Sequence, residues 1–238
     1  NGNTVGQVGT PTGMIANGKV TIRGGTIYGG VASGSEIELR DNAVTIDATN
    51  SDSALVVSSS GTTDAIVTIS VPLKPPTSPF TLSTDTSEQR AAITAFALGS
   101  GNTTVTISAD FQPDYNGKPR PAVVAYSSSG NASVTVNTAL TDVTGGIYCG
   151  SGGNSSNTAT ITLANTLTAT DTISGLLVAG GTVIDPANRA TGVVDFLGGK
   201  LTFDNSIYQN TNPSGDFYPG FSDGRRVYVP VWRVWGLK

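Results

Sequence analysis

Short runs in which apolar and polar residues alternate recur along most of this chain, and they limit its fold more than any other feature. Residues 36–40, 43–47, 65–71 and 104–108 are examples, and an asparagine, serine or proline lies within two positions of at least one end of each run. Alternation with a period of two is typical of a strand that buries one face. About a dozen short runs of this kind, separated by turn residues, predict an all-β domain.

The turn residues between these runs predict antiparallel hairpins. Asn17-Gly18 lies between two apolar runs, and both residue types tolerate positive φ. Asp41-Asn42 separates the runs at 36–40 and 43–47 in the same way. We therefore expect an antiparallel β-sandwich or jelly-roll-like fold.

A β-helix or solenoid is the alternative fold. Pairs of glycines that are followed two residues later by an apolar residue recur at 23–27, 179–183 and 197–201, and they resemble the rungs of right-handed β-helices. A solenoid is expected to repeat at a fixed period, and these units do not. The sequence therefore favours the sandwich over the solenoid.

Residues 86–99 are the one candidate helix, so we expect at most one short helix. Thr86 or Ser87 could cap its start, and Gly99 could end it. The apolar residues from Ala92 to Leu98 also alternate, which makes a strand the competing interpretation.

The composition divides the chain into three parts. Residues 1–12 are rich in glycine, contain only Val5 and Val8 as large apolar residues, and are interpreted as a flexible arm. Residues 13–224 are the all-β domain. Residues 72–79 contain four prolines, which predict a stiff connector and an internal boundary.

Residues 225–238 form a C-terminal segment that contains both tryptophans and four of the thirteen basic residues. Read as a strand, the segment is apolar on both faces, so it either closes the chain's own core or binds a partner. Pro230 favours an edge or a seam between subunits, because proline has no backbone N–H. The candidate interface residues are Val5, Val8, Arg225, Arg226, Tyr228, Trp232, Arg233 and Trp235.

The chain lacks the usual catalytic side chains. It has no histidine, which excludes Ser-His-Asp triads and histidine-ligated metals. Cys149 is the only cysteine, and we interpret it as a small, semi-buried residue. Thirteen basic residues against seventeen acidic ones provide no electrostatic site for nucleic acid. We therefore expect a protein that is not an enzyme and has no cofactor.

Two kinds of modification or ligand site remain as candidates. Asp110, Asp114 and Asn116 place oxygen atoms in one loop, as calcium requires, although such residues more often form local turn bonds. Asn102, Asn131 and Asn154 each begin an N-glycosylation triplet in turn-like surroundings.

The leading hypothesis is a structural subunit that assembles with copies of itself into an extracellular pilus-like filament or a virion surface by strand addition. Low charge, a first residue that is not methionine and the lack of an apolar run of about 20 residues favour a processed protein of the cell or virion surface without a membrane span. One alternative is an adhesin for a receptor or cell-surface glycan, or a phage fibre or decoration protein. The other is a polysaccharide-degrading β-helix enzyme, which would need two carboxyl groups about 5 to 9 Å apart.

Overall fold

The computed structural model describes residues 4–5, 12–47, 53–74, 91–111, 122–138, 143–144, 147–163, 172–174, 177–181, 190–196 and 202–203. All regular structure in these ranges is β-strand, which confirms the all-β prediction. No helix in the described part of the chain is long and apolar enough to cross a membrane.

Two seven-stranded sheets make up most of the molecule. Sheet 1 has the order β19-β16-β13-β11-β8-β5-β2, and sheet 2 has the order β20-β17-β14-β12-β9-β6-β3. The strands of sheet 1 are β2 (Thr12–Ala16), β5 (Gly30–Ser33), β8 (Leu55–Ser59), β11 (Ile93–Ala97), β13 (Val123–Ser127), β16 (Ile147–Ser151) and β19 (Leu177–Gly181). Those of sheet 2 are β3 (Val20–Ile22), β6 (Glu36–Leu39), β9 (Ala65–Ile69), β12 (Thr103–Ile107), β14 (Ala132–Val136), β17 (Thr158–Leu163) and β20 (Thr191–Phe196).

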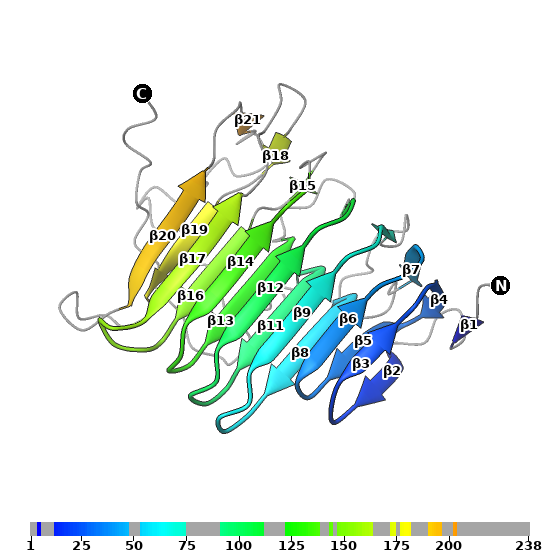
Figure 1. Cartoon of the computed structure of the whole chain (residues 1–238), viewed down its shortest axis with the longest axis horizontal. Coiled ribbons are helices and arrows are strands. Elements are labelled where there is room, and N and C mark those ends of the chain that lie inside the picture. The colour runs from blue at the N-terminus through cyan, green and yellow to red at the C-terminus, as the bar shows by residue number, and fades with distance from the viewer. Residues whose placement is uncertain are drawn as a thin grey trace, which may run out of the picture.

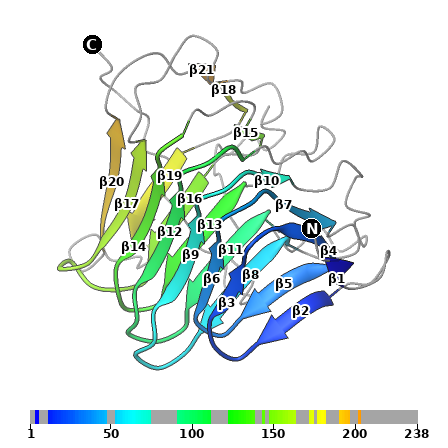
Figure 2. The same ribbon diagram turned by 45° about the vertical axis from the view of Figure 1, so that its right-hand side comes forward.

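Two smaller sheets lie beside them. Sheet 3 contains β1 (Thr4–Val5), β4 (Gly25–Tyr28), β7 (Val44–Asp47) and β10 (Leu73–Lys74). Sheet 4 contains β15 (Val143–Thr144), β18 (Thr172–Ser174) and β21 (Thr202–Phe203). Figure 2 shows the short strands of sheet 3 gathered at the N-terminal side of the stack.

Every strand pair in the four sheets is parallel. The chain visits sheet 1 and then sheet 2 in each coil, and each coil adds one strand to both sheets, so the colours in Figure 1 run in order from blue to orange along the stack. The expected antiparallel sandwich or jelly roll is therefore wrong. The parallel arrangement is compatible with the solenoid alternative.

The expected hairpins are also wrong, because their turns join strands of different sheets. Asn17-Gly18 connects β2 in sheet 1 to β3 in sheet 2. Residues 41–42 connect β6 in sheet 2 to β7 in sheet 3, and Asp41 has a φ of 74°. The corners of a coil and the turns of a hairpin both need residues that tolerate unusual backbone angles. The turn residues therefore do not reveal whether the next strand pairs antiparallel with the one before it.

Within the candidate helix region, the structure supports the strand interpretation. β11 spans Ile93–Ala97, and its side chains alternate between buried and half-buried. β11 and β12 pair with β8 and β9, which precede the proline-rich residues in sequence. Residues 75–90 lie outside the described part of the chain, and the boundary at 72–79 stays a prediction.

The core consists of apolar side chains stacked in columns between the sheets. In sheet 2 one column contains Ile37, Val67, Val105, Val134 and Ile161, and none of these five side chains is exposed. Burying a side chain of this size contributes roughly 1.5–3 kcal/mol. Because each coil covers the column of the preceding coil, the stack forms one continuous core.

Buried serines and close glycines hold the turns between sheets 1 and 2. The Ser127 hydroxyl donates to the Gly101 carbonyl over 2.7 Å and accepts from the Gly130 amide over 2.8 Å. Ser151 repeats this pattern one coil later by donating to the Gly130 carbonyl over 2.7 Å. A Cβ atom on Gly130 would collide with the backbone of Gly101, so these turns stack too closely for a side chain.

We predict that Gly130→Ala destabilises the protein by about 1–3 kcal/mol, because overpacking against backbone atoms that cannot move aside has that cost. Gly18→Ala is the matched control, since a Cβ at Gly18 meets nothing within 4 Å. Its effect is expected to stay within about 0.5 kcal/mol. Chemical denaturation followed by circular dichroism measures both values, and equal destabilisation would contradict the stacking of the turns.

Candidate functional site

A ladder of side-chain oxygens runs along the corner that leads into sheet 2. The Asp64 carboxylate accepts from the Asn102 amide nitrogen over 2.7 Å, and Asn102 Oδ1 accepts from the Asn131 amide over 3.0 Å. Asn131 Oδ1 then accepts from the amide of Thr158 over 2.9 Å. Each of these residues comes directly before or at the start of a strand of sheet 2, so the ladder ties successive coils together.

The three predicted glycosylation residues all lie in exposed turns between sheets 1 and 2. Asn102 and Asn131 belong to the oxygen ladder, a role that the sequence analysis missed. Asn154 Oδ1 accepts from the amide of Ser156 over 2.9 Å, which is an Asx-turn within the triplet. Their exposure satisfies one requirement for modification, and glycosylation stays a prediction.

The predicted calcium loop is only partly described. Asp110 is exposed, and its carbonyl accepts from the Leu73 amide over 3.1 Å, which is a backbone role. Asp114 and Asn116 lie outside the described residues. In the described part of the chain, no three acidic, cysteine or histidine side chains lie close enough together to hold a metal ion.

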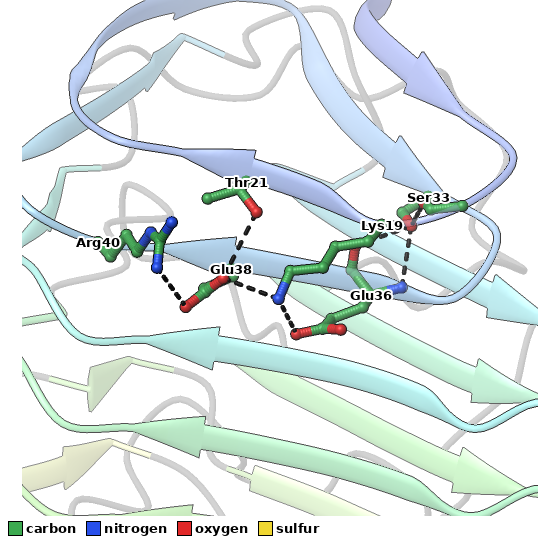
Figure 3. Close-up of polar contacts among 7 residues, drawn as sticks. Lys19, Thr21, Ser33, Glu36, Glu38 and Arg40 are labelled. Atoms are coloured by element: carbon green, nitrogen blue, oxygen red, sulfur yellow. Dashed lines mark hydrogen bonds and ion pairs between the residues drawn. The ribbon is translucent and has the colours of Figure 1, made fainter.

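Charged side chains gather at the N-terminal end of sheet 2, as Figure 3 shows. Lys19 Nζ lies 2.9 Å from Glu36 Oε1 and 2.9 Å from Glu38 Oε2. Arg40 Nη1 lies 3.7 Å from the other oxygen of Glu38, and the Thr21 hydroxyl donates to Glu38 over 3.4 Å. These four charged residues form the Lys19 network.

The Lys19 network has the wrong electrostatics for general acid catalysis. The hydrogen bond from Lys19 lowers the pKa of Glu38, and the same bond, followed by that to Glu36, raises the pKa of Lys19. A glycosidase acid needs a carboxyl group whose pKa is raised. Glu38 instead keeps its negative charge to a lower pH than an ordinary glutamate.

The C-terminal end of sheet 2 has an exposed apolar strand. Val194 of β20 stands in register with Ile161, and so it continues the column of buried residues in the core. Ile161 has no exposed surface, whereas Val194 is 42% exposed and Val193, on the outer side of the same strand, is 39% exposed. Figures 1 and 2 both show β20 at the end of the stack opposite β2 and β3. We call this feature the open end.

The candidate interface residues are mostly beyond the described ranges. Val5 lies in β1, where it pairs with Ile27 of β4, and its side chain is 36% exposed. Val8, Arg225, Arg226, Tyr228, Trp232, Arg233 and Trp235 lie outside the described residues, and their role stays a prediction. The sequence analysis missed Val193 and Val194, because their run resembles any other short strand.

Aromatic residues far apart in sequence meet on the outer side of sheet 1. The rings of Phe96 and Tyr126 are 6.3 Å apart at an interplanar angle of 73°. Tyr148 stands on the next strand, in register with Val124, but it is only 3% exposed. An adhesin needs exposed aromatic surface, and the burial of Tyr148 prevents it from stacking on a sugar ring in this conformation.

Comparisons with protein-family models, with curated proteins and with solved structures found no match to this chain.

We predict that Cys149 does not react with thiol reagents while the protein is folded. It is buried, and burial raises the pKa of its thiol to about 12. At pH about 8.5, where a free thiol is half ionised, almost no thiolate is present in the native state. A chromogenic disulfide reagent should modify Cys149 rapidly in guanidinium and very slowly without it. Equal rates would show that Cys149 is accessible.

Proposed function

We propose that this protein is a structural subunit that assembles with copies of itself, by strand addition, into a filament or coat on the outside of a cell or virion. The open end is the observation that supports the proposal. It presents an apolar strand whose interior-facing Val194 is exposed, although every preceding residue from Ile37 to Ile161 in its column has no exposed surface.

Strand addition would satisfy both chemical needs of the open end. The outer edge of β20 carries backbone N–H and C=O groups that could pair with another strand. An added apolar strand would also cover Val194 and continue the core column. Residues 225–238 of a neighbouring copy have the predicted character of such a strand, with apolar residues on both faces.

The two ends of the coil differ, which favours open assembly over a closed dimer. Val20 and Ile22 of β3 are each only 6% exposed, so the interior is covered at the N-terminal end. In sheet 2, therefore, the interior column is exposed at the C-terminal end and covered at the N-terminal end. A contact between unlike surfaces is heterologous, and it generates a filament when its rotation does not close a ring.

Polysaccharide cleavage has less support. Parallel coils occur with many activities, so the fold by itself does not indicate an enzyme. Glu36 and Glu38, which lie two residues apart on β6, both bind Lys19, and the hydrogen bond from Lys19 lowers the pKa of Glu38. Glu38 is therefore not a suitable acid for glycoside hydrolysis.

We predict that Val194→Asp prevents assembly without unfolding the subunit. In the free subunit residue 194 is partly exposed, so the aspartate remains hydrated. At a seam between copies it would be an unpaired buried charge, which costs about 3–5 kcal/mol. Sedimentation velocity over a range of concentrations measures assembly, and circular dichroism measures folding.

Val193→Asp is the matched control for this experiment. It places the same charge on the same strand, but on the outer side. This variant should assemble much more strongly than Val194→Asp. A wild-type protein that remains monomeric at all concentrations, or two variants that assemble equally well, would refute the proposal.

We predict that Trp232→Ala weakens assembly by about 2–4 kcal/mol, as truncation of a central aromatic anchor does. The melting temperature of the isolated subunit should change little, because the anchor would bind in the neighbouring copy. Electron microscopy shows whether filaments form, and differential scanning calorimetry reports subunit stability. If Trp232→Ala unfolds the monomer, residues 225–238 belong to the chain's own core.

A further inference from the structure

The outer face of sheet 2 carries a regular array of eight side chains, seven of which bear a hydroxyl group. Two columns run across four neighbouring strands, and all eight side chains are half-buried. The first column is Ile66, Thr104, Ser133 and Thr160, and the second is Thr68, Thr106, Thr135 and Thr162. We call these eight residues the threonine face.

The threonine face is neutral, and charges lie only beyond its limits. Glu36 and Glu38 occupy the two columns on β6, and they belong to the Lys19 network. Asp195 continues the second column on β20. Between these strands all eight positions are uncharged. Among the described residues, the hydroxyls of Thr68, Thr106, Thr135 and Thr162 have no protein hydrogen-bond partner, so they can bind something outside the chain.

Parallel pairing gives the face two repeat distances. Neighbouring strands lie about 4.8 Å apart, and alternate residues on one strand are about 6.6 Å apart. The three pairings between β9, β12, β14 and β17 are continuous, without a bulge. Threonine is branched at Cβ, so rotation about its χ1 angle is restricted. Its hydroxyl and methyl groups are therefore spaced at the same two distances as the backbone.

The composition of the face argues against the usual partners. Binding to nucleic acid depends on lysine and arginine, which are absent from all eight positions. Protein interfaces depend on tryptophan, tyrosine and arginine anchors, which are also absent from them. A partner that fits this face is itself neutral, polar and periodic.

Ordered water in ice has these properties and nearly the same spacing. With an O–H···O distance of about 2.75 Å, tetrahedral bonding places second-neighbour oxygens about 4.5 Å apart and gives a stacking repeat of about 7.3 Å. The strand spacing of about 4.8 Å exceeds the first of these by about 0.3 Å. Across four strands this mismatch reaches only about 1 Å, and the spacing of about 6.6 Å along each strand is about 0.7 Å shorter than the stacking repeat. Over a face only two residues wide, water bound to the hydroxyls can therefore follow the positions of the crystal lattice.

We propose that the threonine face binds the surface of an ice crystal. The hydroxyls form hydrogen bonds to lattice water, and the methyl groups fill the spaces between these water molecules. This function goes beyond assembly and uses different residues, since the threonine face lies on the side of the coil and the open end lies at its terminus.

The test measures how much of the full-length protein enters slowly grown ice, together with the gap between melting and freezing points in a nanolitre osmometer. We expect wild-type enrichment in ice and faceted crystals. Thr135→Tyr, at the centre of the face, should reduce the ice-bound fraction by at least about tenfold, because few central contacts dominate an interface. Circular dichroism and thermal melting verify that the variant folds.

Thr45→Tyr is the matched control. Thr45 is also half-buried in the middle of parallel strands, but it lies in sheet 3, paired with Thr26. This variant should keep the wild-type enrichment in ice. Exclusion of the wild-type protein from ice would overturn the proposal, and so would an equal loss in both variants. A dimer that Thr135→Tyr dissociates, without any ice binding, would assign the face to a second copy instead. Val194→Asp, which tests assembly, should leave ice binding unchanged.

Discussion

In-register parallel pairing between successive coils is the interaction on which the rest of the structure depends. It places like residues over like residues, so the core becomes a set of apolar columns such as Ile37, Val67 and Val105. The same pairing stacks the turns, where Ser127 and Ser151 bond the coil before them. One geometric rule therefore produces the core, the corner ladders and the ordered outer face.

The sequence predicted the strands but not how they pair. The alternation of apolar and polar residues correctly indicated strands at β6, β9 and β12. Any sheet with one buried and one solvent-exposed face has this pattern, because every second residue is buried. Strand direction leaves no such pattern. The repeat was also hidden, since 17 residues separate Val20 from its partner Ile37 whereas 38 separate Val67 from its partner Val105. The number of residues between paired strands therefore varies from coil to coil.

The candidate surfaces were hard to find in the sequence for the same reason. Thr106 and Thr135 become neighbours only through a register that joins strands 29 residues apart. Each strand alone is an ordinary alternation of valine or isoleucine with threonine. Val194 is likewise unremarkable until its column is known, because its exposure matters only in comparison with the buried Ile161 beneath it. The glycine and asparagine turns, by contrast, were located correctly and misread only as hairpins.

A coil of this kind separates two types of contact. Its sides repeat with every strand, so a side can match a partner that is itself periodic, as the uncharged columns of sheet 2 illustrate. Its two ends have no strand beyond them among the described residues, and the residue types there differ from those along the sides. At the N-terminal end the charged Lys19 network lies beside β3 and Ile15 of β2 is exposed, whereas at the C-terminal end β20 exposes Val193 and Val194. If copies of the chain assemble as proposed, the different composition of the two ends would give that assembly a direction, and the repeating side would stay free for another partner.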